Sequence, residues 1–245
     1  LDIKYQTKMK KILKQYEKRV WNNAKDEKLN YRFRKPNNCN PNKKYPILFF
    51  LHGAGGRGSN NKDQILDAGS INAFTKQGIF NKHDSYLLAA QVPNNEKWVN
   101  VDWGSLEHTM PKISKTMFLA FELLDDTLIK NNIDINRIYV VGISMGGFGV
   151  WDALQRRPNF FAAGIPICGG GDIKQSKSIS HIPIWIWHGS QDAVINVKRS
   201  RDMYNSIKQF THKIKFTEIK DRGHNVWIDA WNSKNLWNWL YLQSL

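Results

Sequence analysis

From Tyr45 onward the chain alternates continuous apolar runs with longer segments whose apolar residues recur at helical spacing. Continuous apolar runs occupy residues 46–52 and 86–92, and further strands are predicted over residues 137–141, 163–168, 183–188 and 213–219. Such runs are typical of strands buried on both faces of a parallel sheet. The helical segments between them span residues 112–130, 145–157, 198–210 and 226–242. We therefore predict an α/β fold, with a mostly parallel central sheet flanked by helices on both faces.

The segment before this pattern is different in character. Residues 3–21 place apolar side chains among lysines and predict a basic helix that packs by one side on the domain. Tyr31–Arg34 alternates as an early strand and stops before Pro36. We expect residues 1–25 to form this helical segment and residues 26–245 a single domain, because no linker or repeat interrupts the pattern.

The composition limits the classes of partner. The formal charge is +15, but the basic residues are scattered, and no zinc-finger, helix-turn-helix or RNA-binding pattern accompanies them. We predict no nucleic-acid partner, although a positive surface would favour acidic polysaccharides. No apolar stretch is long enough for a membrane span. The first residue is Leu1, as expected if a leader peptide were removed, so a secreted or periplasmic location is expected, with the cytoplasm as the alternative.

Two cysteines are too few for a disulfide framework. Cys168 ends an apolar run, where a buried thiol is expected, and Cys39 lies in a polar loop. No zinc-ligand spacing is present, so we predict neither a metal nor an organic cofactor.

The motif Gly142-x-Ser144-x-Gly146 lies between a predicted strand and a predicted helix. This is the nucleophile-elbow pattern of α/β-hydrolases, in which a tight turn lifts a serine to the amino end of a helix. The glycines are needed because a side chain at either position would collide with neighbouring backbone. We predict that Ser144 is a nucleophile.

A serine nucleophile requires a general base and an acid that orients it, in the chain order Ser, Asp or Glu, His. His224 lies in a loop after the last predicted strand and is our predicted base; His181 and His212 precede strands, and His188 is expected to hydrogen-bond within its own loop. For the acid we predict Asp192, which follows the preceding strand. Its rivals are Asp172, which lies one strand earlier, and Asp221, which lies only three residues from His224.

The glycine-rich loop after the first buried strand is the predicted oxyanion hole. Residues 51–56 read LHGAGG, without the Gly-Lys-Ser/Thr ending of a phosphate-binding loop. We predict that the backbone N–H groups of Ala54 and Met145 bind the oxyanion, with Gly55 as the alternative to Ala54.

Five motifs in this order resemble the α/β-hydrolase esterases related to polyhydroxybutyrate depolymerases and feruloyl esterases, many of which are labelled predicted peptidases. They are FLHGAGGRG at 50–58, GISMGGFGVW at 142–151, PICGGGD at 166–172, WHGSQD at 187–192 and GHNVW at 223–227. The resemblance covers residues 30–245 and implies a secreted or periplasmic carboxylesterase acting on ester decorations of plant polysaccharide.

Three tryptophans follow strands on the side where the site is expected. Trp98, Trp103 and Trp227 are candidates for stacking on an aryl acyl group or a sugar ring, with ordinary packing as the alternative. We therefore predict a serine carboxylic ester hydrolase that acts through an acyl-enzyme on short-chain or aryl esters, feruloyl or acetyl in type, possibly carbohydrate-linked. The alternatives are a serine peptidase on the same fold and a non-catalytic binding module.

Overall fold

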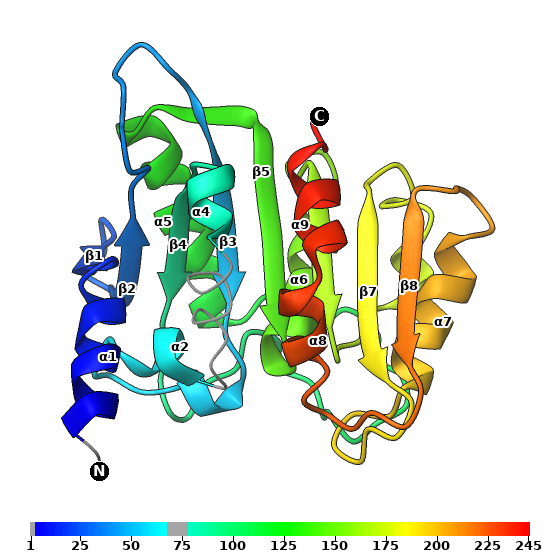
Figure 1. The fold of residues 1–245 in the computed structure, drawn as a ribbon. Helices are drawn as coiled ribbons and strands as arrows, with labels where there is room; N and C mark the ends of the chain where they lie inside the picture. Colours follow the sequence, from blue (N-terminus) through cyan, green and yellow to red (C-terminus); the bar gives the residue numbers. More distant parts are fainter. Residues whose placement is uncertain (1–2, 68–77) are drawn as a thin grey trace.

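The structure is a computed structural model that describes residues 3–67 and 78–245. Within these residues one sheet has eight strands, in the order β1-β2-β4-β3-β5-β6-β7-β8 (Figure 1). The strands are β1 (Glu17–Asn22), β2 (Lys28–Arg34), β3 (Tyr45–Leu51), β4 (Tyr86–Ala90), β5 (Ile133–Ile143), β6 (Ala163–Ile167), β7 (Ile184–Gly189) and β8 (Ile214–Ile219). The six strands β3 to β8 run parallel to one another. At one edge β2 pairs antiparallel with β4, and β1 pairs antiparallel with β2. The mostly parallel sheet confirms the predicted fold class.

The helices lie on both faces of the sheet. The described helical segments are α1 (Ile3–Leu13), η1 (Ala54–Gly56), α2 (Asp63–Leu66), α4 (Ile79–Lys82), α5 (Lys115–Lys130), α6 (Met145–Arg156), η3 (Ile173–Gln175), α7 (Lys198–Ile207), α8 (Trp227–Asn232) and α9 (Lys234–Tyr241). In Figure 1, α1, α4, α8 and α9 lie in front of the sheet, and α5, α6 and α7 lie behind it. None of the helices within the described ranges combines the length and apolarity that crossing a bilayer requires.

The alternating side chains of the central strands feed two separate apolar cores. On β3, Ile47 and Phe49 pack in the core shared with α5, α6 and α7, whereas Leu48 and Phe50 pack in the core shared with α1, α4 and α9. Every residue of β3 is buried. The continuous apolar run in the sequence therefore reflects a strand that is covered on both faces.

Two predicted helices differ from those observed. The helix predicted over residues 3–21 ends at Leu13, and residues 17–22 form strand β1, which pairs antiparallel with β2. Hydrogen bonding to the sheet edge overrides the helical spacing of the apolar residues here. The helix predicted over 226–242 is divided at Ser233, whose hydroxyl accepts a hydrogen bond from the Leu236 N–H and so begins a second helix.

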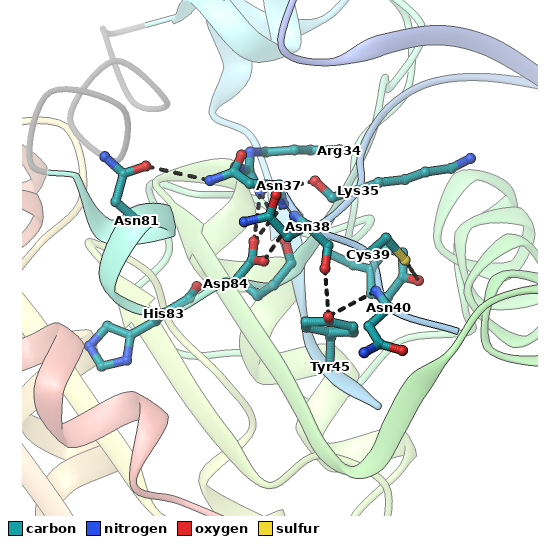
Figure 2. Close-up of polar contacts among 12 residues, drawn as sticks. Arg34, Lys35, Asn37, Asn38, Cys39, Asn40, Tyr45, Asn81, His83 and Asp84 are labelled. Carbon is teal, nitrogen blue, oxygen red and sulfur yellow. Dashed lines mark hydrogen bonds and ion pairs between the residues drawn. The ribbon is translucent and has the colours of Figure 1, made fainter. Parts of the chain in front are cut away.

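The loop between β2 and β3 is held at the amino ends of β3 and β4 (Figure 2). The buried Arg34 guanidinium donates to the Asn37 side chain at 2.6 Å, and the Asn37 N–H donates to Asp84 at 2.7 Å. The Tyr45 hydroxyl donates to the Asn38 carbonyl at 2.8 Å. This polar cluster lies at the opposite end of the strands from Ser144. It therefore holds the loop in place and takes no part in the candidate site.

Candidate active site

Ser144 lies between the end of β5 and the start of α6. Its backbone has φ 53° and ψ −117°, a conformation that residues other than glycine rarely adopt. The turn is held because the Ser144 N–H donates to the Ile167 carbonyl of β6 at 2.8 Å, and the Ser144 carbonyl accepts from the Phe148 N–H at 3.1 Å. The hydroxyl is thereby presented at the amino end of a twelve-residue helix.

The two motif glycines permit this turn by close packing. A Cβ atom on Gly146 would lie 1.9 Å from the Leu51 carbonyl oxygen, and one on Gly142 would lie 2.5 Å from the Gly146 carbonyl oxygen. The turn is therefore pressed against the end of β3. Because of this contact, Ser144 lies beside the glycine-rich loop that follows Leu51.

His224 and Asp192 complete a chain of hydrogen bonds to Ser144. His224 Nε2 lies 2.8 Å from Ser144 Oγ, and His224 Nδ1 lies 2.7 Å from Asp192 Oδ2. Since Nδ1 faces a carboxylate, it carries the hydrogen, and the lone pair on Nε2 faces the serine hydroxyl. The structure thus brings together the three side chains that the sequence selected.

The rival residues have other partners. Asp172 accepts from the Met110 and Lys174 N–H groups, and Asp221 accepts from the Gln191 side chain. His181 Nε2 contacts the Pro158 carbonyl at 2.8 Å. These contacts brace loops and involve neither Ser144 nor His224.

The Asp192 side chain is completely buried, yet it is held in the charged form. Burial by itself raises the pKa of Asp192, but hydrogen bonds from His188, His224 and the Ile195 N–H outweigh it and keep the pKa well below the usual range. A carboxylate that stays ionised at neutral pH is suited to stabilising an imidazolium on His224.

Ala54 and Met145 each begin a helical segment, η1 and α6 respectively. The first N–H groups of a helix have no acceptor within it, so both residues present donors of the kind an oxyanion requires.

His52 holds the peptide that carries the Ala54 N–H. Its Nδ1 lies 2.6 Å from the Gly53 carbonyl oxygen, and its Nε2 accepts from the Val92 N–H at 3.0 Å. The Gly53 carbonyl and the Ala54 N–H belong to one planar peptide unit and point in opposite directions. Orienting the carbonyl therefore orients the donor, a contribution that the sequence reasoning missed although His52 directly precedes Gly53.

Because His52 is buried, we expect the protein to lose stability in mild acid. Burial lowers the pKa of His52 to about 4. The unfolded chain binds a proton here below pH ~6.5 and the folded chain does not, so stability is lost as pH falls through that window. In urea titrations, this group should contribute a loss of about 2 kcal/mol in unfolding free energy between pH 7 and pH 5.

His52→Asn should remove that contribution while keeping a short side-chain N–H donor. The matched control is His181→Asn, because His181 is exposed. If His52→Asn retains the same loss between the two pH values as the unmodified protein, the assignment is wrong.

The three candidate tryptophans have different environments. Trp98 is fully buried, and its Nε1 donates to the His52 carbonyl at 3.0 Å, which favours the packing alternative: it supports the glycine-rich loop from within the core. Trp103 is half-buried, with Lys97 Nζ 4.6 Å from its ring centre. Trp227 is half-buried and meets the His224 ring edge-on at 5.2 Å.

Cys168, His188 and Asp192 place possible ligand atoms within 4.8 Å of one another. Their hydrogen bonds argue against metal ligation. The Cys168 thiol donates to the His224 carbonyl, and burial raises its pKa well above the usual value. His188 Nε2 contacts the Ile195 carbonyl and therefore carries a hydrogen. The group is a hydrogen-bonded cluster behind His224.

The sheet and its flanking helices define an α/β-hydrolase. A family model described as Phospholipase/Carboxylesterase matches residues 38–233, which is most of the chain, and the chain belongs to this family.

Three known proteins show similarity over different lengths. A crystal structure described as a thermostable esterase superposes with a TM-score of 0.88 at 32% identity, over 96% of this chain and 64% of that one. A ferulic acid esterase structure has a TM-score of 0.70 at 16% identity, over 92% and 98% of the two chains. A bifunctional acetylxylan esterase/xylanase from Neocallimastix patriciarum is 30% identical over 102 residues, which are 39% of this chain and 15% of that protein. The chain thus spans less than two thirds of the thermostable esterase and a small part of the curated relative.

Proposed function

We propose that this chain is a serine carboxylic ester hydrolase in which Ser144 is the nucleophile, His224 the general base and Asp192 the orienting acid. The observation that carries the proposal is the pair of hydrogen bonds that join Asp192, His224 and Ser144, with the serine at a positive φ. Activated nucleophiles are recognised by this geometry.

The reaction proceeds in two halves. His224 Nε2 takes the hydroxyl proton as Ser144 Oγ attacks the ester carbonyl carbon, and the Ala54 and Met145 N–H groups stabilise the oxyanion. The C–O bond to the alcohol breaks as His224 returns the proton to the leaving oxygen, which leaves an acyl group on Ser144. Water then gives a proton to His224 and attacks the acyl carbon. The C–Oγ bond breaks as His224 returns this proton to Ser144 Oγ, which releases the acid and restores the serine.

The test is hydrolysis of p-nitrophenyl acetate by the purified protein beside its Ser144→Ala variant. Activity in the unmodified protein alone supports the proposal. Equal rates in both proteins, or none in either, would exclude it. Cleavage of peptide p-nitroanilides in preference to esters would favour the peptidase alternative.

For the substrate we propose short-chain or aryl esters, including those attached to plant polysaccharide. Trp103 and Trp227 supply aromatic surface near the glycine-rich loop and His224 respectively. The relation to an acetylxylan esterase and the positive charge of +15 favour a polysaccharide that carries uronic acids.

Trp227→Ala should lower kcat/KM for methyl ferulate about tenfold and change p-nitrophenyl acetate hydrolysis much less, because a ring stacked on an aryl group contributes on the order of 1 kcal/mol. The control is Trp21→Ala, which alters a half-buried tryptophan on β1. A preference of the unmodified protein for acyl chains longer than octanoyl would contradict the proposed aryl specificity.

A further inference from the structure

The penultimate residue of strand β7 is a second histidine, which the proposed reaction does not use. His188 is wholly buried, and its Nε2 lies 3.1 Å from Asp192 Oδ2, the same oxygen that accepts from His224. Nε2 also lies 3.0 Å from the Ile195 carbonyl oxygen, and Nδ1 lies 2.7 Å from Ser200 Oγ.

These contacts determine where the hydrogen atoms lie. Both neighbours of Nε2 are acceptors, so Nε2 carries a hydrogen and shares it between Asp192 and the Ile195 carbonyl. Ser200 Oγ lies 2.7 Å from Nδ1 and 3.4 Å from the Gly169 carbonyl oxygen, so with the hydrogen of His188 on Nε2 the hydroxyl donates to the nearer acceptor, Nδ1. Ser200 is itself buried on α7. A rigid chain of contacts therefore runs from α7 through His188 to the acid.

The Asp192 carboxylate is held on both oxygens. Oδ1 accepts from the Val194 N–H at 2.8 Å and from the Ile195 N–H at 2.9 Å, whereas Oδ2 faces the two imidazoles. Four donors thus fix the rotation of the carboxylate. The two backbone donors on Oδ1 would remain if His188 were replaced, but Oδ2 would lose one of its two donors and only His224 would hold it.

We propose that His188 is a positioning residue: its Nε2–H holds Asp192 Oδ2 at His224 and shares the negative charge that would otherwise act on His224 alone. This inference rests on the proposed function of Asp192 and His224. A purely structural His188, which only fills space at the end of β7, is the alternative that an experiment must separate.

Other ionisable groups that face His188 come from three neighbouring elements. Cys168 follows β6, and His224 lies in the loop before α8. Glu218 lies opposite His188 in the register of β8 and pairs with Arg201 of α7. None of these groups is altered by a substitution at position 188, so a change in the titration of His224 reports the loss of the His188 donor.

Two variants separate hydrogen bonding from packing. His188→Leu retains apolar volume and removes the donor, whereas His188→Gln places an N–H at a similar reach. For His188→Leu we expect kcat for p-nitrophenyl acetate to fall about 10- to 30-fold with little change in KM, since hydrogen bonds to charged groups are the stronger ones. The pKa of His224 should rise, which moves the acid limb of the kcat/KM profile upward by about 0.5–1 pH unit. His188→Gln should recover most of both effects.

The titration of His224 can also be followed by NMR in the protein without substrate. The positioning role is excluded if His224 titrates at the same pH in His188→Leu as in the unmodified protein. It is also excluded if the titration of His224 shifts as much in His188→Gln as in His188→Leu. The control His181→Leu alters an exposed histidine and should change neither readout. An unmodified protein that hydrolyses no ester would contradict the proposed function, whereas the NMR titration would still decide whether His188 acts on Asp192.

Discussion

Ser144→Ala should lower kcat/KM for p-nitrophenyl acetate by about 10⁵-fold or more, because no other group can form the covalent intermediate and the remaining donors and binding contacts supply only the residual rate. KM and the melting temperature should change little. The substitution removes only the hydrogen bond between the hydroxyl and His224, and the backbone hydrogen bonds of the turn are retained. The measurement is the rate of nitrophenol release under first-order conditions, with extensively purified protein.

Ser144→Gly is the matched variant. It also lacks the nucleophile, but glycine adopts φ 53° and ψ −117° without the strain that a Cβ atom causes. We expect it to be as inactive as Ser144→Ala. Its free energy of unfolding should be about 1 kcal/mol higher than that of Ser144→Ala. If Ser144→Ala retains more than a few per cent of the activity, another residue is the nucleophile.

Gly146→Ala should destabilise the fold by about 4 kcal/mol or more, which is at the extreme of single substitutions. The added Cβ would lie 1.9 Å from the Leu51 carbonyl oxygen and 2.8 Å from the His52 carbonyl oxygen. Both are backbone atoms at the end of a fully buried strand, so they cannot rotate away as a side chain would. The measurement is the free energy of unfolding in urea, or the soluble yield where the variant does not fold.

The control for this change is Gly104→Ala. The nearest atom to an added Cβ there is Asp102 Oδ1 at 3.5 Å, which is an ordinary van der Waals contact. We expect its unfolding free energy to stay within about 0.5 kcal/mol of the unmodified protein. Equal stability of the two variants would show that the contact between the elbow and the end of β3 is not as tight as the structure has it.

Much of the candidate site could be predicted from local patterns. A parallel sheet places the carboxyl ends of its strands along one edge, so residues that follow strands in sequence become neighbours in space. This rule selected Ser144, Asp192 and His224 from the chain, and in the structure His224 lies within hydrogen-bonding distance of the other two.

The supporting residues could not be predicted in the same way. His52 and His188 each lie at the carboxyl end of a strand, directly before a glycine, where a histidine can point either to the surface or into the core. Trp98 follows β4 on the expected side of the sheet, yet its side chain turns inward to the His52 carbonyl. The direction of a side chain depends on packing between distant segments, which local spacing does not encode.

The amino-terminal segment shows the same limit. Apolar residues at helical spacing predicted one helix through residue 21, whereas residues 17–22 pair with β2 at the edge of the sheet. Backbone hydrogen bonds to a neighbouring strand outweigh a weak local preference when an unpaired sheet edge is available.

Taken alone, the sequence determined the alternation of strands and helices from Tyr45 onward, the buried strands and the nucleophile turn, because these follow from the period of apolar residues and from steric limits on the backbone. The tertiary structure decided which polar groups meet: the two imidazoles on Asp192 Oδ2, the His52 contact with the Gly53 carbonyl, and the inward turn of Trp98. Such contacts join residues separated along the chain or depend on rotamers set by packing, and only the folded arrangement of the strands brings their donors and acceptors within reach.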